Sequence, residues 1–571
     1  MMKFKGFFSR SDLTIALWQF RQEFVAVGAF SMVANILMLT PTLYMLQVYD
    51  RVLVSRSELT LLAVSLITLF LFFITALIEW MRSRILVRAG VRLDGVLSSR
   101  VFNASFEAHL NESEVDPSRA FQDMTEIRQF LTGNGIFAFF DAPWAPIYLG
   151  VLFFLHPYLG YLAIMFALIQ VALAWFGHHQ TVMPAEQMMK TQNGVNLYLQ
   201  SKLKNAEVIE SMGMLSNLRN RWQSRHCVYM HEHGTSHALT HRVTAWSKFI
   251  RYGQQSVSLA AGALLVIDGQ LSPGAMVAAN VLLSRALAPI DMLVGSWQMF
   301  IRARLAFHRI EELLTKHPER DPALTRVAPV GQIELVNVVA TAPGREQPIL
   351  KNISFSVLPA TVNVVLGPSG SGKSTLARVL VGIWPEVQGS VLLDGLPIGG
   401  WDRVELGPYL GYLPQDVELF EGTIAENIAR FAEVDSPKVI AAAKCAGLHE
   451  MVLKFPKGYD TSIGEAGNLL SGGQRQRIGL ARAVYGDPVL VVLDEPNANL
   501  DDAGEAALAQ AIQALKSAGT TVILITHRPG VLRLADTLLV LRDGAVQFNG
   551  PRDEVLAQMQ AARSQAAGQS I

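Results

Sequence analysis

A glycine-rich loop lies in this chain between an apolar run and a helix-compatible run, and this combination is compatible with few folds. Residues 367–375 match the pattern G-x-x-x-x-G-K-[ST], with an apolar run at 362–366 before them and a helix-compatible run at 375–381 after them. A strand, a glycine-rich turn and a helix in this order bring backbone N–H groups together at the positive end of the helix, where phosphate binds. A Gly/Ser-rich turn without a ligand is the alternative, and the flanking strand and helix argue against it.

The residue types in this loop suit a nucleoside triphosphate. Lys373 is placed to reach the terminal phosphates, and the Ser374 hydroxyl is a suitable ligand for Mg²⁺. The predicted contacts to the nucleotide are Gly367, Pro368, Ser369, Gly370, Ser371, Gly372, Lys373, Ser374 and Thr375.

Two carboxylates follow a second apolar run, at residues 489–493. A parallel strand that is buried on both faces and ends in Asp494 and Glu495 lets the first carboxylate reach Mg²⁺ through water and the second polarise an attacking water. An apolar run followed by Asp-Glu is weak support by itself. Downstream of a phosphate loop, it predicts that the bound nucleotide is hydrolysed.

Composition places another part of the chain in a membrane. Only 17% of the 571 residues are charged, against about 25% in an ordinary soluble protein. Six apolar runs are long enough to be spanning helices, at about 24–46, 59–80, 135–155, 158–176, 249–267 and 275–299. The formal net charge is zero and no basic stripe is present, so nothing indicates a nucleic-acid partner.

The connections between these runs predict the orientation. The loops at 82–132 and 178–248 are long and rich in Arg and Lys, whereas those at 156–157 and 268–274 are short and contain neither. The positive-inside tendency therefore places the N-terminus, both long loops and the phosphate loop in the cytoplasm. Each long loop is interpreted as two extended helices joined by a turn, with the breaks at Asp116-Pro117 and at residues 212–214.

Three charged residues lie inside the apolar runs: Asp141, Arg285 and Asp291. A charge at the bilayer centre costs at least about 2.5–3.5 kcal/mol, so these side chains should face a water-filled path or one another rather than lipid. A transport path and simple structural pairing remain equal alternatives. Two prolines, Pro143 and Pro146, are expected to kink the third span.

A histidine cluster offers two interpretations. His233, His237 and His241 recur at helical i, i+4 spacing, which can chelate zinc. The H-E-x-x-H pattern is not completed, because Thr235 stands where its second histidine would be. A solvated face of a cytoplasmic helix is the favoured interpretation.

Further short motifs accompany the phosphate loop in a definite order. A Leu-Ser-Gly-Gly-Gln run at 470–474 leads into a helical stretch at 475–485, Gln415 lies in a polar segment, and His527 follows an apolar strand at 521–526. Each feature alone is ordinary, because Ser-Gly-Gly is usually a turn and a histidine at a strand end is usually a packing residue. Because all of them occur in one chain, in this order with the phosphate loop and Asp494, they are not explained by chance.

In this order the motifs resemble the ATP-binding cassette superfamily over nearly the whole chain. The resemblance implies a membrane α-helical exporter domain of six spans, fused to a cytoplasmic α/β P-loop nucleotide-binding domain. The expected divisions are an N-terminal cytoplasmic segment (1–23), the membrane domain (24–315), a linker (316–331) and the nucleotide-binding domain (332–571).

The same resemblance assigns roles to individual residues. It implies ATP and Mg²⁺ as cofactors, with Glu495, His527 and Gln415 as catalytic residues and Ser374, Gln415 and Asp494 around the metal. It also identifies a signature motif that closes over the phosphate loop of a second copy, and a D-loop aspartate. These residues are Ser471, Gly472, Gly473, Gln474 and Asp501.

Three stretches of the membrane half narrow the resemblance: MLQVYDRV at 45–52, DAPWAPIY at 141–148 and SRALAP at 284–289. They look like type I secretion ATPases of Gram-negative bacteria, in the branch that exports metalloproteases and lipases. This implies an inner-membrane homodimer in contact with membrane lipid, a periplasmic adaptor, an outer-membrane channel and a secreted polypeptide with a C-terminal signal. An exporter of lipids or small hydrophobic compounds is the alternative.

One position departs from the family pattern. The family usually stacks adenine on an aromatic side chain near the first strand, and this chain has Ala342 there. Loss of the ring is expected to remove about 1–3 kcal/mol of stacking, so nucleotide affinity or base selectivity is expected to be modest.

Overall fold

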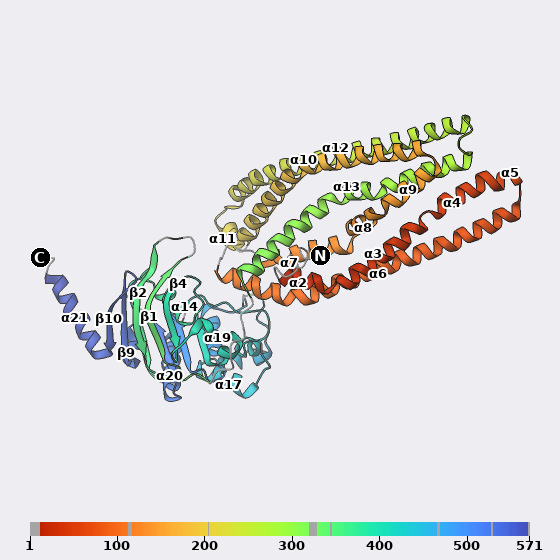
Figure 1. Ribbon diagram of the computed structural model, residues 1–571. Coiled ribbons are helices and arrows are strands. Elements are labelled where there is room, and N and C mark those ends of the chain that lie inside the picture. Colours follow the sequence, from red (N-terminus) through yellow and green to blue (C-terminus); the bar gives the residue numbers. More distant parts are fainter. Residues whose placement is uncertain are drawn as a thin grey trace. The chain divides into compact units, whose positions relative to one another are not determined.

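The computed structural model describes residues 12–111, 117–203, 205–318, 328–342, 345, 347–464, 467, 469–498, 500–526 and 529–568. The chain forms two compact units (Figure 1). The first contains the helices up to α13, and the second contains the strands and helices from β1 onward. The segment predicted as a linker lies between the end of α13 at Lys316 and the start of β1 at Ile333.

The first unit is helical. Its elements are α2 (Asp12–Gln19), α3 (Arg21–Leu37), α4 (Thr40–Gln47), the π-helix η1 (Val48–Val52), α5 (Leu53–Ser55), α6 (Glu58–Asn111), α7 (Pro117–Thr132), α8 (Asn134–Asp141), the 3₁₀ turn η2 (Ala142–Trp144), α9 (Ala145–Leu155), α10 (Pro157–Leu203), α11 (Ala206–Ser211), α12 (Leu215–Ile267) and α13 (Pro273–Lys316).

Among the described residues, five helical segments are long and apolar enough to cross a membrane: Arg21–Ser55, Glu58–Asn111, Gly135–Leu155, Pro157–Leu203 and Pro273–Lys316. The sixth predicted run, 249–267, forms the last part of α12, which does not meet the same measure. The reason lies in its composition, because Arg251, Gln254 and Gln255 lower the hydropathy of this stretch. Gln254 is nevertheless fully buried, and neither its Nε2 nor its Oε1 has a hydrogen-bond partner among the described residues.

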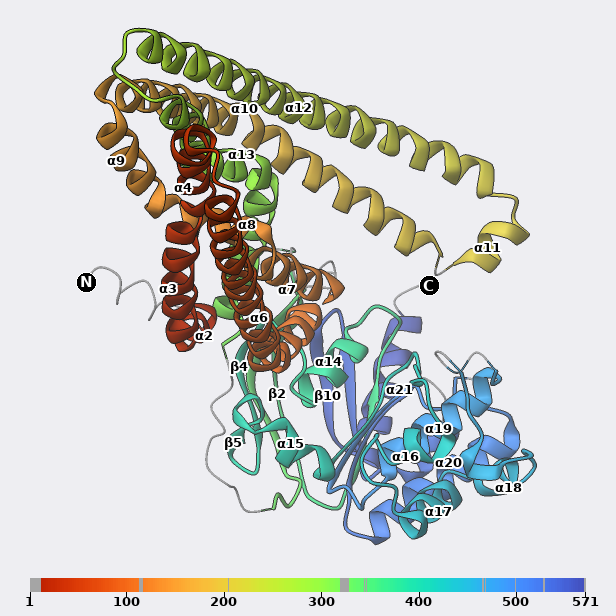
Figure 2. The same ribbon diagram turned by 90° about the vertical axis from the view of Figure 1, so that its right-hand side faces the viewer.

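The second long loop, at 178–248, consists mainly of helices that continue from the apolar runs on either side of it. α10 and α12 lie side by side along their length, and α11 lies at the tip between them (Figures 1 and 2). The predicted turn at 212–214 connects α11 to α12, and Gly213 there has a φ of +62°. In the first long loop Pro117 begins α7, while Asp116 lies outside the described residues. The hairpin interpretation of residues 178–248 is therefore confirmed.

The third apolar run is broken as its prolines predict. Residues 142–144 form the 3₁₀ turn η2 between α8 and α9. Pro143 lies in the first turn of η2, and Pro146 lies in the first turn of α9. A ring without an N–H cannot continue the α-helical ladder, so the chain changes direction at this point. The predicted kink is confirmed.

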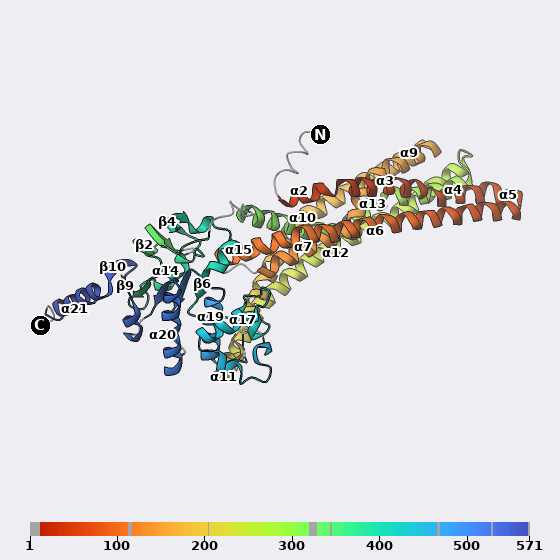
Figure 3. The ribbon, with the colours of Figure 1, turned by 90° about the horizontal axis from the view of Figure 1, so that it is seen from below.

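The two ends of the helical unit are held by different contacts. At one end the short connections meet, because His156 Nε2 lies 3.1 Å from Gln270 Oε1. At the other end α7 and α13 are joined by a bidentate ion pair in which Arg309 Nε and Nη2 lie 2.8 and 2.5 Å from the Asp123 carboxylate. Figure 3 shows α6 running beside α4 and α7 between these ends.

The second unit contains two sheets. The strands are β1 (Ile333–Thr341), β2 (Pro348–Val357), β3 (Val362–Leu366), β4 (Val387–Leu393), β5 (Leu396–Pro397), β6 (Leu410–Leu413), β7 (Leu490–Asp494), β8 (Thr521–Ile525), β9 (Thr537–Arg542) and β10 (Ala545–Pro551). The six-stranded sheet has the order β10-β9-β3-β8-β7-β6 and is parallel except for β10. The four-stranded antiparallel sheet has the order β2-β1-β4-β5. Strand-like segments are expected from the sequence to start at Ile333 and Ile353; β1 begins at Ile333 as expected, whereas β2 begins at Pro348, five residues earlier than expected.

Eight α-helices belong to the described part of this unit: α14 (Lys373–Leu380), α15 (Arg403–Leu406), α16 (Ile424–Ile428), α17 (Ser436–Cys445), α18 (His449–Val452), α19 (Gly472–Val484), α20 (Asp502–Ser517) and α21 (Arg552–Gly568). Two of them pack on opposite faces of the parallel sheet. Leu376 and Leu380 of α14 share a core with one set of alternating strand residues, including Val492. Ile478 of α19 shares the other core with the intervening residues, including Leu493.

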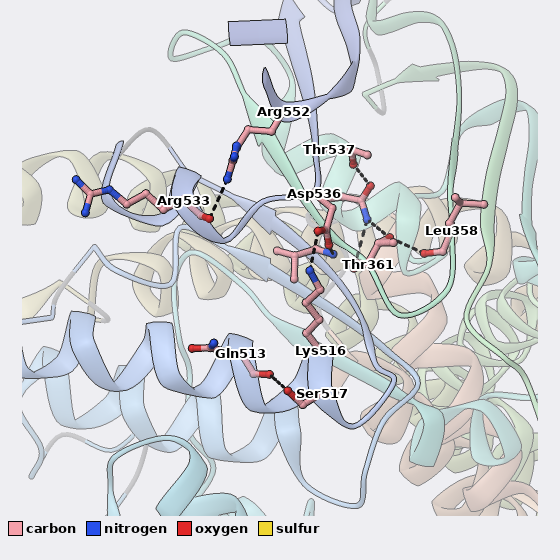
Figure 4. A network of polar contacts seen from close by, with 11 residues as sticks. Leu358, Thr361, Gln513, Lys516, Ser517, Arg533, Asp536, Thr537 and Arg552 are labelled. Carbon is pink, nitrogen blue, oxygen red and sulfur yellow. Dashed lines mark hydrogen bonds and ion pairs between the residues drawn. The ribbon is translucent and has the colours of Figure 1, made fainter. Parts of the chain in front are cut away.

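A polar network joins the start of β3 to Asp536, which lies just before β9, and to Lys516 of α20 (Figure 4). The Asp536 carboxylate accepts hydrogen bonds from the Val362 N–H at 2.9 Å and from Lys516 Nζ at 2.6 Å. Burial by itself raises the pKa of Asp536, but these two hydrogen bonds and the nearby positive charges hold it below its usual value. The network fixes where β3, and hence the loop that follows it, begins.

Candidate nucleotide-binding and membrane sites

The phosphate loop connects β3 to α14. Gly370 and Gly372 have φ values of +80° and +94°, which side chains strongly disfavour. Lys373 Nζ donates to the carbonyl oxygens of Gly367 and Pro368 at 3.0 and 2.9 Å, so its ammonium lies over the loop. The loop thus combines the first turn of a helix, left-handed glycines and one buried cation, which is the arrangement that binds phosphate.

Asp494 is the last residue of β7 and is 2% exposed. Burial raises the pKa of its carboxyl, and a hydrogen bond from Ser374 opposes that shift. The Oδ1 atom has no hydrogen-bond partner among the described residues. A buried carboxylate oxygen beside a serine hydroxyl suits a hard cation such as Mg²⁺, so the residues present fit this metal.

Glu495 and Gln415 are brought together although they are 80 residues apart. Gln415 Nε2 lies 3.4 Å from Glu495 Oε2. β6 and β7 are neighbouring parallel strands, so their carboxyl ends meet at one edge of the sheet. Glu495 also has a φ of +46°, and its N–H donates to the Ile525 carbonyl at 2.9 Å. A non-glycine residue in this conformation is uncommon and is often found at functional sites. His527 lies outside the described residues.

The predicted signature residues form the start of α19. Ser471 caps this helix by accepting from the Gln474 N–H at 3.3 Å, and the Ser471 N–H donates to Gln474 Oε1 at 2.8 Å. Gly472 and Gly473 occupy the first turn between them. This reciprocal capping leaves the helix N-terminus well formed and open to an anion.

Arg477 is a residue of this region that sequence reasoning missed. Its Nη2 lies 2.5 Å from Asp501 Oδ1, and Asp501 caps α20 by accepting from the Gly504 N–H at 2.9 Å. The hydrogen bond from Gly504 and the nearby Arg477 guanidinium lower the pKa of Asp501. The signature helix and the predicted D-loop are therefore directly connected. No spacing rule in the sequence identifies this pair.

The segment expected to face the nucleotide base contains Ala342 just after β1. The carbonyl of the preceding Thr341 accepts from Trp384 Nε1 at 2.8 Å. Ala342 itself is half-buried, and its carbonyl accepts from the Arg345 N–H at 3.0 Å. The position thus presents only a methyl group for contact with a nucleotide base.

Asp141 lies in a buried polar cluster that joins three helices. Its Oδ1 atom accepts from Arg82 Nη1 at 2.8 Å and from Asn35 Nδ2 at 3.0 Å. The same Arg82 nitrogen lies 2.9 Å from Ser31 Oγ, and the guanidinium stands 4.2 Å from the centre of the Phe137 ring. Arg82 and Asn35 are functional neighbours that the sequence analysis did not select.

Asp291 belongs to a second cluster, formed by α10, α12 and α13. Ser247 Oγ donates to its Oδ1 at 2.8 Å, Gln170 Nε2 also donates to that oxygen, and Arg251 Nη1 lies 3.6 Å from Oδ2. Arg285 is exposed on α13. Both aspartates are thus paired within the chain and lie in separate clusters. Their role in a transport path stays a prediction.

The histidine rings of α12 form a ladder. The ring centroids of His233 and His237 are 4.2 Å apart, and those of His237 and His241 are 6.1 Å apart. Across the part of the chain that the structure describes, no group of three or more His, Cys, Asp or Glu side chains is arranged to hold a metal ion.

Comparisons with known proteins agree with these features. The profile described as ABC transporter matches residues 350–498, and the profile described as ABC transporter transmembrane region matches residues 24–289. A bacterial Atm1-family ABC exporter with ATP bound is similar in structure, with a TM-score of 0.82 and 25% identity, covering 97% of this chain and 99% of that chain.

Two curated proteins extend the similarity over nearly the whole length. The leukotoxin translocation ATP-binding protein LktB of Pasteurella haemolytica-like sp. (strain 5943B) is 28% identical, covering 95% of this chain and 77% of that protein. The type I secretion system ATP-binding protein PrsD of Rhizobium meliloti (strain 1021) is 42% identical, covering 96% of this chain and 95% of that protein. The chain therefore belongs to the ABC transporter family, among the ATP-binding proteins of type I secretion systems.

Proposed function

We propose that this protein is an ATP-hydrolysing exporter that drives polypeptides across the bacterial inner membrane as part of a type I secretion system. The observation that carries the proposal is the full-length similarity to a type I secretion ATP-binding protein. The meeting of Asp494, Glu495 and Gln415 at the carboxyl ends of neighbouring parallel strands supports it. A chain with several apolar helices and this catalytic arrangement suits coupled transport.

In the ATPase reaction, the phosphate loop and Lys373 bind the phosphates and offset their charge. Glu495 holds an attacking water and accepts its proton, while the Gln415 amide, 3.4 Å away, orients the Glu495 carboxylate. His527 is expected to contact the terminal phosphate.

Mg²⁺ is the metal that these residues would hold. Ser374, Asp494 with its unpartnered Oδ1, and Gln415 are the residues that would hold the ion. When bound, Mg²⁺ neutralises charge on the phosphate oxygens.

The placement of α14 and α19 supports the homodimer that we propose. Because these helices pack on opposite faces of one sheet, the Ser471 end of α19 is separated from the phosphate loop of the same chain. A signature that binds ATP therefore needs the phosphate loop of a second copy. Each dimer would contain two composite sites, completed by Gly472, Gly473, Gln474 and Asp501.

The similarity to secretion proteins supports the partners that we propose. We propose a periplasmic adaptor, an outer-membrane channel and a secreted polypeptide with a C-terminal signal, with the N-terminus and the ATP-binding unit in the cytoplasm. The basic composition of the long loops supports this orientation. Asp141, Arg285 and Asp291 are the proposed path residues.

Export of lipids or small hydrophobic compounds is the second candidate. One observation favours it: a cavity of about 280 Å³ between α10, α12 and α13. Apolar side chains such as Val171, Val243 and Leu293 form most of its wall, while Trp297 and His178 bound it on one side and are hydrogen-bonded at 3.1 Å. Such a cavity suits an apolar group.

The two candidates are separated by reconstitution. Inverted membrane vesicles containing the chain and an adaptor are supplied with ATP and a polypeptide ending in a secretion signal, and protection of the polypeptide from protease is measured. ATP-dependent protection that is lost in Glu495→Gln supports polypeptide export. Transbilayer movement of a fluorescent lipid without protection of the polypeptide would favour the second candidate.

A further inference from the structure

The first apolar segment ends in a motif that the ATPase reaction does not use. Residues 48–52 form a π-helix, η1, between α4 and α5. A single widened turn of this kind is rare and often marks a functional position. It places Asp50 against the start of α13, more than 200 residues later in the chain.

The Asp50 carboxylate binds the N-terminus of α13 through both oxygens. Oδ1 accepts from the Gly274 N–H at 2.8 Å, and Oδ2 accepts from the Ser272 hydroxyl. An anion at this end satisfies free N–H groups and meets the positive end of the helix dipole. We call the contact between Asp50, Ser272 and Gly274 the clasp.

The clasp depends on a glycine for steric reasons. A Cβ atom at position 274 would lie 2.5 Å from Asp50 Cγ and Oδ1, and 2.7 Å from Oδ2. These distances are far shorter than a van der Waals contact, so a side chain at 274 and the carboxylate at 50 cannot occupy their present positions together.

The start of α13 stays capped without Asp50. Ser272 is itself the N-cap, and its Oγ accepts from the Ala275 N–H at 3.1 Å. Release of the carboxylate therefore frees the Gly274 N–H but does not uncap the helix. Asp50 is only half-buried, so water can replace the lost contacts. The clasp is suited to opening and closing.

The other end of α13 is also held by the first helices. Arg100 Nη2 of α6 donates to the carbonyl oxygens of Leu314 and His317 at 3.2 and 2.5 Å, which caps the C-terminus of α13. One helix of 44 residues, with Pro289 inside it, thus runs from the clasp to the segment that leads into the ATP-binding unit. A displacement of the C-terminal end of α13 is therefore expected to move its N-terminal end at the clasp.

From these contacts we propose that the clasp is a releasable latch at the extracytoplasmic end of the membrane unit, and that Asp50 is a positioning residue for transport. When the clasp is closed, it holds α4 and η1 against α13. When it is open, α4 and η1 can separate from α13, so that a polypeptide can leave. The proposal rests on the proposed export of polypeptides. It assigns to Asp50 no part in ATP hydrolysis itself.

A reversible lock tests the proposal. In a full-length chain with Cys227 and Cys445 replaced by serine and alanine, Asp50→Cys and Ser272→Cys are joined by a short, reducible, thiol-specific bifunctional reagent. The reduced double-cysteine chain lacks the Asp50 carboxylate, so its own export should be lowered severalfold, as in Asp50→Ala. Relative to this reduced form, polypeptide protection in vesicles is expected to fall at least about tenfold further when the chain is locked, and to recover to the level of the reduced form on reduction. ATP hydrolysis without polypeptide should change less than about twofold. Because locked and reduced forms are the same chain, misfolding cannot produce the difference.

Unchanged export by the locked form would overturn the latch. If the wild-type chain and the reduced double-cysteine chain both export the polypeptide, the proposed function stands, whether or not crosslinking reduces export. Absence of export by the wild-type chain would instead remove the proposed function, which keeps the two failures distinct.

A substitution cycle tests the contact itself. Asp50→Ala should lower the polypeptide exported per ATP severalfold, and Asp50→Asn, which keeps one acceptor oxygen, should recover part of it. Gly274→Ala should resemble Asp50→Ala, and the double variant should be no worse than either single one, because each change opens the same contact. Asp268→Asn, at an exposed carboxylate just before α13, is the control and should leave export unchanged. Additive losses in the double variant would refute the clasp.

Discussion

Replacing Asp141 with alanine should destabilise the helical unit strongly, because it leaves a buried arginine without its counter-ion. The Arg82 and Asp141 side chains are only 10% and 16% exposed, and they are 2.8 Å apart. Removing one partner of a buried ion pair costs about 3–5 kcal/mol. Arg82 keeps its contacts with Ser31 Oγ and the Phe137 ring, so we expect a loss near the lower limit, about 3 kcal/mol.

The assay is reversible unfolding of the full chain in mixed detergent micelles, followed by tryptophan fluorescence. Asp141→Ala, Arg82→Met and the double variant form a double-mutant cycle. The double variant should lose at least about 2 kcal/mol less unfolding free energy than the two single variants lose together. The matched control is Asp94→Ala, which breaks the more exposed pair with Arg128 and should cost less than about 1 kcal/mol. If Asp141→Ala lost no more unfolding free energy than Asp94→Ala, or if the losses in the cycle were additive, the pair of Arg82 and Asp141 would not stabilise the helical unit as a buried ion pair.

Three further predictions concern the ATP-binding unit. Glu495→Gln should retain nucleotide binding but slow hydrolysis at least about a hundredfold, whereas Lys373→Ala should weaken binding itself; fluorescent-nucleotide titration and phosphate release separate the two. Ala342→Tyr should tighten ATP binding about tenfold by adding a stacking surface, and an unchanged Kd would remove that explanation. The lowered pKa of Asp536 means that its ionised form stabilises the folded state above the pKa of an unfolded aspartate, about 3.9. That stability should be lost as the pH falls through the lower folded pKa, so acid titration of wild-type unfolding should converge with that of Asp536→Asn, while parallel curves would contradict the assignment.

Much of the ATP-binding unit was predictable because its signals are local. The phosphate loop lies between a strand and a helix that are adjacent in sequence, and Asp494 directly follows an apolar run. The capping of α19 by Ser471 and Gln474 is a four-residue pattern. The meeting of Gln415 with Glu495 is different, since it depends on which strands are neighbours in the sheet, and only the family resemblance indicated it.

The polar contacts of the membrane unit were not predictable in the same way. Asp141 was selected because a carboxylate in an apolar run is costly, but its partner Arg82 lies just beyond the predicted second span and carries no periodic signal. The contact of Asp50 with the start of α13 joins two distant segments through a turn geometry that no sequence pattern specifies. The count of spans was also affected, because Gln254 and Arg251 in the last part of α12 lower its hydropathy, although Gln254 is buried and Arg251 pairs with Asp291 of α13.

Complementation between two inactive chains tests whether each ATP site is shared between two copies of the protein. Lys373→Ala removes the phosphate-loop cation, and Ser471→Arg blocks the signature, so each variant alone should hydrolyse ATP at a small fraction of the wild-type rate. Mixed dimers, isolated with two different affinity tags, would contain one composite site with both elements intact. We predict recovery to roughly half of the wild-type turnover if the two sites act independently. Mixed dimers that form but stay as inactive as their parents would contradict the claim that each chain supplies halves of two different sites.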